Sequence, residues 1–191
     1  MTSRRTIILA GHSGDLTTIR TGIADPDAIV RTSALGALRR AEALTAQDLT
    51  DAQGDPDFRV RRRAAELAAE FPDVDLEPFL HDAEPLVVEM AAWSCGERPE
   101  PPAAIIDRLS VLVISHDDAL VREAAVAALG AIGDERGLAA ILTAVKDKPA
   151  VRRRAVIALA PFDGPEVDAA YEHALKDRDW QVRQAAEDLA D

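Results

Sequence analysis

The stretch "DPDFRVRRRAAELA" at residues 55–68 decides the fold, because its pattern recurs along the whole chain. "KDKPAVRRRAVIAL" at residues 146–159 carries the same Arg triplet, and Ala and apolar residues follow it at the same spacing. Four further stretches align with these two: "DPDAIVRTSALGAL" (25–38), "DAEPLVVEMAAWSC" (82–95), "HDDALVREAAVAAL" (116–129) and "DRDWQVRQAAEDLA" (177–190). The valine that aligns all six is called the anchor valine: Val30, Val60, Val87, Val121, Val151 and Val182. Self-similarity at a period of about 30 residues indicates a repeat architecture.

Each copy has the pattern of a helix that begins just before its anchor valine. An Ala stands four residues after every anchor, and an apolar residue usually follows seven or eight residues after it, which is one stripe of a 3.6-residue period. Acidic residues precede most of these helices, where a carboxylate can cap the first N–H groups: Asp25, Asp55, Asp82, Asp117 and Asp177. A shorter and less regular helical segment precedes each copy. The sequence therefore predicts an all-α fold of about six helical pairs.

The spacing D-x-x-x-x-V-R-x-x-A-x-x-A-L resembles HEAT repeats, in the short form found in phycobilisome bilin lyases. The resemblance covers the chain from about Asp15 to Asp191. It implies one domain, residues 1–191, folded as a right-handed α-α superhelix (solenoid) whose second helices line a concave face. Residues 1–14 are expected to be an N-terminal cap or a flexible segment. Proteins with such arrays are mostly interaction scaffolds.

Composition narrows the classes of partner and site. With 48% apolar and 29% charged residues, the chain is expected to fold. Its net charge of −12 argues against a general affinity for nucleic acid or for anionic membranes. One cysteine and no Cys/His pattern predict neither a disulfide within the chain nor a metal site, and no cofactor is expected. Without a long apolar run or a convincing signal peptide, we expect no membrane span and a cytoplasmic protein.

The Arg that follows the anchor valine is expected to be structural. In repeats that this chain resembles, it commonly pairs with an Asp before a helix of the same or the adjacent copy. Five copies carry it, and we call these the ladder arginines: Arg31, Arg61, Arg122, Arg152 and Arg183. The third copy departs from the pattern, with Val88 at this position.

Side chains two and six residues after the anchor share one helix face, which we expect to bind a partner protein or peptide. Aromatic and Arg side chains dominate interface energies, and this face carries both. Together with the last arginine of the second triplet, the candidate residues are Arg62, Glu66, Glu89, Trp93, Glu123, Arg153, Arg154 and Ile157. The alternative is an ordinary solvated surface on which Trp93 folds back onto a neighbouring helix.

Local charge distinguishes the two Arg triplets. Glu66 and Glu70 lie within helical reach of the first triplet, whereas Arg153 and Arg154 have no acidic residue at those offsets. Residues 73–100 carry eight acidic residues against one Arg, which suits a basic partner segment. Residues 135–163 carry six basic residues against three acidic ones, which suits an acidic or phosphorylated partner.

A catalytic or nucleic-acid-binding function is the alternative. One HEAT-like family excises alkylated DNA bases with a basic concave face, aromatic residues and a catalytic Asp, and the Trp93 region or the basic fifth copy could act in this way. Ser13 lacks the second Gly of a nucleophile elbow, and Cys95 occupies a core position. The acidic centre opposes a phosphate backbone. We therefore expect a non-catalytic scaffold without catalytic residues, while a glycosylase-like or lyase-like enzyme stays open, as do the partner and the oligomeric state.

Overall fold

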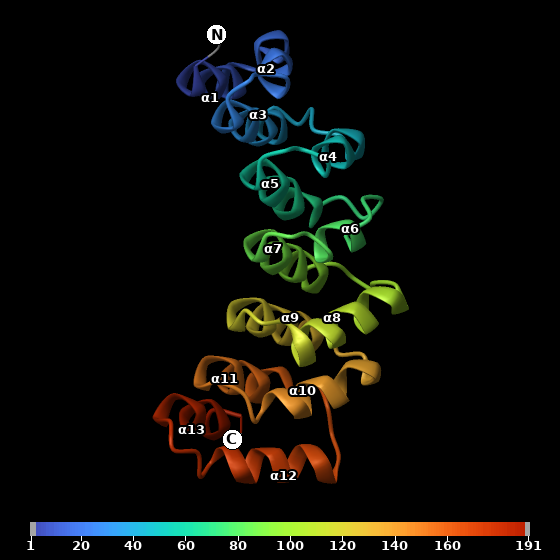
Figure 1. The fold of residues 1–191 in the computed structure, drawn as a ribbon, viewed down its shortest axis with the longest axis vertical. Coiled ribbons are helices and arrows are strands. Elements are labelled where there is room, and N and C mark those ends of the chain that lie inside the picture. The colour runs from blue at the N-terminus through green and yellow to red at the C-terminus, as the bar shows by residue number, and fades with distance from the viewer. Residues whose placement is uncertain (1–2, 190–191) are drawn as a thin grey trace. The chain divides into compact units, whose positions relative to one another are not determined.

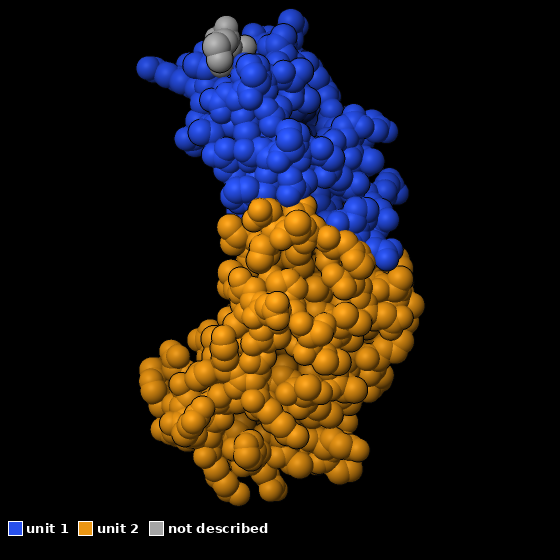
Figure 2. All heavy atoms as spheres, viewed as in Figure 1, with its two compact units in different colours: residues 1–79 blue, residues 80–191 orange. Residues whose placement is uncertain are grey.

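The computed structural model describes residues 3–189, and these residues form thirteen α-helices and one short 3-10 helix (Figure 1). The helices are α1 (Arg4–Ser13), α2 (Leu16–Ile23), α3 (Ala28–Arg40), α4 (Ala46–Ala52), α5 (Phe58–Ala68), α6 (Glu77–Leu80), α7 (Pro85–Gly96), α8 (Ala103–Ser115), α9 (Ala119–Ile132), η1 (Glu135–Gly137), α10 (Leu138–Ala144), α11 (Pro149–Ala158), α12 (Pro165–Ala174) and α13 (Trp180–Glu187). The chain divides into two compact units, residues 1–79 and 80–191 (Figure 2).

In the first unit, the N-terminal segment is helical. Residues 4–13, for which a cap or a flexible segment was expected, form α1, and the side chain of Ser3 caps it by accepting the N–H of Thr6 at 3.1 Å. Helix α1 packs on α3. Gly11 allows this close approach, because a Cβ at its position would lie 2.9 Å from the Cβ of Ala37. Helices α2, α3, α4 and α5 continue the stack, with α3 against α5.

In the second unit, the helices alternate between two layers. The second helices of the repeats contact one another in the order α7, α9, α11 and α13, while the first helices α8, α10 and α12 contact one another in turn. Helix α8 also packs against α9, α10 against α11, and α12 against α13. The described residues contain no strand. The chain is thus an all-helical α-solenoid, as the repeat pattern predicted.

Glycines set the spacing between the second helices. A Cβ at Gly130 of α9 would lie 2.6 Å from both the Cα and the Cβ of Ala158 in α11. A Cβ at Gly96 of α7 would lie 3.0 Å from the Cα of Ala128 in α9. Each glycine stands nine residues after one anchor valine, and each alanine stands seven residues after the next. The same close contact therefore recurs in register at successive repeats.

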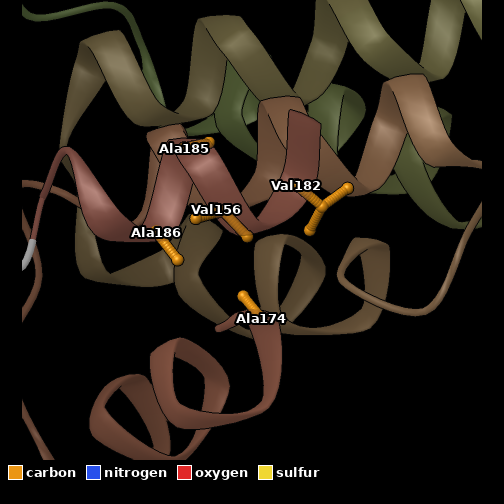
Figure 3. Close-up of a cluster of buried hydrophobic side chains, with 5 residues drawn as sticks. All are labelled: Val156, Ala174, Val182, Ala185 and Ala186. Atoms are coloured by element: carbon orange, nitrogen blue, oxygen red, sulfur yellow. The ribbon is translucent and has the colours of Figure 1, made fainter. Parts of the chain in front are cut away.

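The anchor valines form the core, as predicted. All six, and the alanines four residues after them, are at most 3% exposed. In the last three helices, side chains of α11, α12 and α13 converge on one another (Figure 3). The half-buried Tyr171 packs against them. This cluster consists of Val156, Ala174, Val182, Ala185 and Ala186. Burying each valine contributes roughly 1.5–3 kcal/mol to folding, so the repeat motif itself supplies the core.

The helix caps differ from the expectation. The side chains that accept an N–H from the first turn belong to Asp27, Asp57, Asp118 and Asp179. The expected cap Asp55 instead accepts the N–H of the cap residue Asp57 at 2.8 Å, and Asp177 does the same for Asp179. The prediction that Asp25, Asp55, Asp82, Asp117 and Asp177 cap the second helices was therefore wrong in register. The carboxylates of Asp55 and Asp177 therefore stabilise the turn before the helix. In this position they can accept hydrogen bonds from a second donor as well.

Candidate interaction surface

The ladder arginines tie each second helix to the turn before it. In every case Nη1 donates to a backbone carbonyl of the repeat's own turn, at 2.7–2.9 Å. The acceptors are the carbonyl oxygens of Asp25, Asp55, His116, Asp147 and Asp177, in chain order. This contact satisfies a turn carbonyl that would otherwise lack a partner within the repeat.

Ladder arginines also reach forward to a carboxylate of the next repeat. In the first unit, Arg31 donates to both oxygens of Asp55 at 2.7 Å. In the second unit, Arg122 binds Asp147 at 2.6 and 2.8 Å, and Arg152 forms an equivalent pair with Asp177. The hydrogen bonds from Arg152 hold the pKa of Asp177 below its ordinary value, and those from Arg122 do the same for the pKa of Asp147. These arginines join consecutive repeats, and we assign them to the scaffold.

The junction between the third and fourth repeats lacks the arginine of this pair. Val88 replaces the ladder arginine and is 1% exposed. Five residues before the next anchor valine, where Asp55 and Asp177 stand in their repeats, the fourth repeat has His116. The Nδ1 atom of His116 accepts the N–H of Asp118 at 3.1 Å and so replaces the carboxylate in the turn. A buried carboxylate without its arginine would be costly, so the two replacements are mutually consistent.

Four of the predicted site residues line one hollow on the second-helix face of the second unit. Glu89 and Trp93 come from α7, Glu123 from α9 and Arg154 from α11, around a space of about 490 Å³. The other lining residues are Gly96, Glu97, Leu120, Ala124, Ala127, Ala128 and Ala131. Trp93 is 44% exposed and Leu120 is 47% exposed. This first hollow therefore has an alanine floor, two large exposed apolar side chains and a rim with carboxylates.

Arg153 and Ile157 line a second hollow, of about 450 Å³, between α11 and α13. Its other lining residues are Trp180, Gln181, Gln184, Ala185, Asp188 and Leu189. Trp180 is 64% exposed and was not among the predicted site residues, because it precedes its anchor valine by two positions. Large apolar residues directly before an anchor valine are also exposed, at Ile29, Leu86 and Leu120, but Trp180 stands one position earlier than these.

The second Arg triplet has an acidic neighbour that the helical offsets did not reveal. Nη2 of Arg154 lies 3.7 Å from Oε1 of Glu123, and Nη2 of Arg153 lies 3.9 Å from the same oxygen. Glu123 belongs to the preceding repeat. Both distances exceed those of a hydrogen bond, and the Nε atoms of both arginines are buried without a hydrogen-bond partner among the described residues. Two guanidinium groups thus share one carboxylate.

The remaining predicted site residues, Arg62 and Glu66, lie on α5 in the first unit. Glu66 forms an ion pair with Arg63 at 2.8 Å. Glu70, which was expected to neutralise the same triplet, pairs with Arg39 of the preceding repeat. Gly36 provides the space for the Arg63 guanidinium, since a Cβ there would lie 2.8 Å from Nη2.

The described residues offer no metal centre. Within residues 3–189, no group of three or more His, Cys, Asp or Glu side chains is arranged to hold a metal ion. Among the described helices, none has the length and apolar character needed to cross a bilayer. Cys95 is fully buried, as its core position predicted.

Comparisons of this chain with known proteins identify its family. The family model for HEAT repeats matches residues 74–160 and 106–190, more than half of the chain. A search of curated sequences gave no match. Among solved structures, the Escherichia coli protein YibA is similar, with a TM-score of 0.67 and 16% identity, over 97% of this chain and 73% of YibA.

Two further solved structures share the fold at low sequence identity. A designed armadillo repeat protein in complex with the peptide (KR)4 has a TM-score of 0.63 and 18% identity, over 92% of this chain and 98% of the design. Human deoxyhypusine hydroxylase in complex with glycerol has a TM-score of 0.50 and 18% identity, over 98% of this chain and 77% of the enzyme. The repeat register, the ladder of ion pairs and the family match agree, and the chain belongs to the HEAT-repeat family.

Proposed function

We propose that this chain is a non-catalytic interaction scaffold that binds an extended segment of a partner protein on the second-helix face of its second unit. The observation that carries the proposal is the first hollow, where Trp93 and Leu120 stand exposed above a floor of alanines. The hollow forms because α9 carries only alanines along this floor. An apolar side chain of the partner fits between the two large residues.

Burial energetics favour this use of the hollow. A large apolar side chain that moves from water into such a site gains roughly 1.5–3 kcal/mol, and aromatic residues are enriched among the anchors of interfaces. Trp93 also presents an indole N–H that a peptide carbonyl can accept. The first hollow therefore supplies both an apolar contact and a polar group for an extended backbone.

The charge around the first hollow indicates the chemical character of the partner segment. Exposed Glu97 lies on the rim, in a stretch (residues 73–100) with eight acidic residues and one Arg. Basic side chains next to the apolar one would be attracted to this rim. A designed repeat protein of the same fold has been solved with a peptide of alternating Lys and Arg, which supports a basic partner segment here.

Nucleic-acid binding and base-excision or lyase chemistry are the competing functions. The carboxylates on the first hollow oppose a phosphate backbone, because each phosphate contact needs a cation. The likeness to deoxyhypusine hydroxylase, at 18% identity, concerns the fold. No arrangement of described side chains favours either function over peptide binding.

The test is a titration with a fluorescein-labelled peptide that contains one leucine with lysines on one side only, and binding is followed by fluorescence anisotropy. We expect Trp93→Ala to weaken binding by about tenfold and to leave the thermal midpoint nearly unchanged, because Trp93 is exposed. The matched control is Ile114→Ala on α8, which removes an exposed apolar side chain outside both hollows and should bind as the parent does.

Two outcomes contradict the proposal. Equal peptide affinity in the parent and Trp93→Ala would exclude the first hollow as the binding site, and a collapse of the thermal midpoint would show that Trp93 is a core residue. A labelled DNA duplex serves as the third probe. Tight DNA binding that falls steeply with added salt would favour the nucleic-acid function instead.

A further inference from the structure

The two hollows meet at Arg153 and Arg154. Arg154 lines the first hollow and Arg153 lines the second, and both side chains come from α11. We propose that these two arginines bind an acidic side chain of the partner segment, placed between one apolar residue in the first hollow and another in the second. This inference rests on the proposed function, and it defines the sequence pattern that the partner must carry.

The hydrogen-bonding state of the two arginines supports an added carboxylate. In the ladder, one arginine satisfies one carboxylate with two hydrogen bonds of 2.6–2.9 Å. At Arg153 and Arg154, two guanidinium groups stand 3.7 and 3.9 Å from one oxygen of Glu123. Among the described residues, Glu123 is the only carboxylate within 4.0 Å of either guanidinium group, and several of their N–H donors have no carboxylate at hydrogen-bond distance. A second carboxylate would balance the charge and accept charge-assisted hydrogen bonds from these donors.

The two arginines are also accessible to a ligand. Their side chains are 38% and 37% exposed, although their Nε atoms are buried. The planar groups suit a carboxylate better than lysine ammonium groups would.

Geometry sets the spacing of the pattern. Packed helices lie about 9 Å apart, and the first hollow is centred on α9 while the second lies between α11 and α13. The two apolar sites are then about 14 Å apart, which an extended chain spans with about four residues. The acidic side chain falls between them, over α11.

The charges on either side of the first hollow also fix the direction of the segment. Glu97 lies at the end of α7, on the opposite side from Arg154 on α11. On the α7 side of the residue that fills the first hollow, the partner segment should therefore carry a basic residue. On the α11 side it should carry an acidic one. A uniformly basic peptide would meet repulsion at Arg153 and Arg154, so the site should discriminate against it.

The experiment compares three fluorescein-labelled peptides that differ at one position. Each carries a lysine, a leucine, the variable residue and a second leucine, with the leucines about four residues apart. The variable residue is Asp, Ser or Lys. For the parent protein we expect the Asp peptide to bind about tenfold more tightly than the Ser peptide, because a charge-assisted pair replaces a neutral contact. The Lys peptide should bind more weakly than either.

The double variant Arg153→Gln, Arg154→Gln should bind the Asp and Ser peptides equally and keep the affinity of the parent for the Ser peptide. Its matched control is Lys146→Gln, Lys148→Gln, which removes two exposed positive charges from the same repeat outside both hollows. The control should keep the preference for Asp. Glu123→Gln, which removes the competing carboxylate, should strengthen binding of the Asp peptide.

The outcomes separate this inference from the proposed function. If the peptides bind with Trp93-dependent affinity but the parent does not distinguish Asp from Ser, the acidic-residue site is wrong and the scaffold function stands. A preference for Asp that persists in the Arg153→Gln, Arg154→Gln variant overturns the assignment in the same way. If none of the peptides binds the parent, the proposed function fails as well.

Discussion

Arg152 donates two hydrogen bonds, of 2.9 and 2.7 Å, to the carboxylate of Asp177 in the following repeat. A third, of 2.8 Å, goes to the carbonyl of Asp147 in the turn of its own repeat. The two side chains are only 8% and 7% exposed. A buried ion pair of this kind holds together only because the remaining donors and acceptors are also satisfied.

Removing one partner of this pair should destabilise the protein strongly. We expect Arg152→Met to lower the free energy of unfolding by about 3 kcal/mol, because it leaves Asp177 as a buried charge without a counter-ion. Urea denaturation followed by circular dichroism measures the change. The control is Arg136→Met, which breaks the exposed pair between Arg136 and Asp134 and should change the urea midpoint little. Equal losses in the two variants would show that burial is not the determining factor.

Stability should fall in acid. The hydrogen bonds from Arg152 and Arg122 keep the pKa values of Asp177 and Asp147 below the ordinary Asp value of about 3.9. A group whose pKa is lower in the folded state adds stability above the unfolded pKa and loses it as pH falls through the folded pKa. The urea midpoint should therefore decrease below about pH 4, and less steeply in Asp177→Asn. A midpoint that rises on acidification would contradict this.

A methyl group at Gly130 should push two helices apart. The added Cβ would lie 2.6 Å from the backbone of Ala158, so α9 and α11 must separate, at a cost of about 1–3 kcal/mol. This loss should appear even though Ala favours helices more than Gly does.

Gly36→Ala is the control for this effect. Its new Cβ would meet only the terminal guanidinium of Arg63, which can move, and Ala improves helix propensity. Thermal denaturation should show a lower midpoint for Gly130→Ala and an unchanged or higher one for Gly36→Ala. The close-packing explanation is untenable if Gly130→Ala is neutral.

The ion pair that is absent between the third and fourth repeats can be introduced by mutation, and a double-mutant cycle then measures its strength. Val88→Arg alone should destabilise the protein, because it places a guanidinium at a position that is 1% exposed. His116→Asp alone should also destabilise. The double variant should recover part of the combined loss, with a coupling of about 1–3 kcal/mol, measured by urea denaturation. Strictly additive losses would mean that this junction differs in geometry from the others.

The sequence predicted what one repeat determines by itself. The burial of Val60 and Ala64 follows from the helical period, which each copy repeats. The structural role of the ladder arginine came instead from the resemblance to HEAT repeats. The caps were misplaced because the turn offers two carboxylates two residues apart, such as Asp55 and Asp57, and spacing does not distinguish them.

Side-chain contacts between different repeats were harder to predict. Glu123 and Arg154 stand on different second helices, and their proximity depends on how one helix is offset along the next. That offset comes from the glycine contacts, which a single copy does not reveal. Trp180 was missed for another reason. The candidate face was limited to positions two, three and six after the anchor valine, whereas Trp180 stands two positions before it and is 64% exposed.

The ladder has a polarity, since Arg31, Arg122 and Arg152 each pair with a carboxylate of the following repeat. A fifth repeat copied whole and inserted after itself would bring one Arg152 and one Asp147 with it, so that both junctions of the copy have a donor and an acceptor. A copy of the third repeat placed at the same point would set Val88 before Asp177 and leave that carboxylate without its arginine. The array can therefore lengthen by tandem duplication at some positions and not at others, and the repeats are not interchangeable modules.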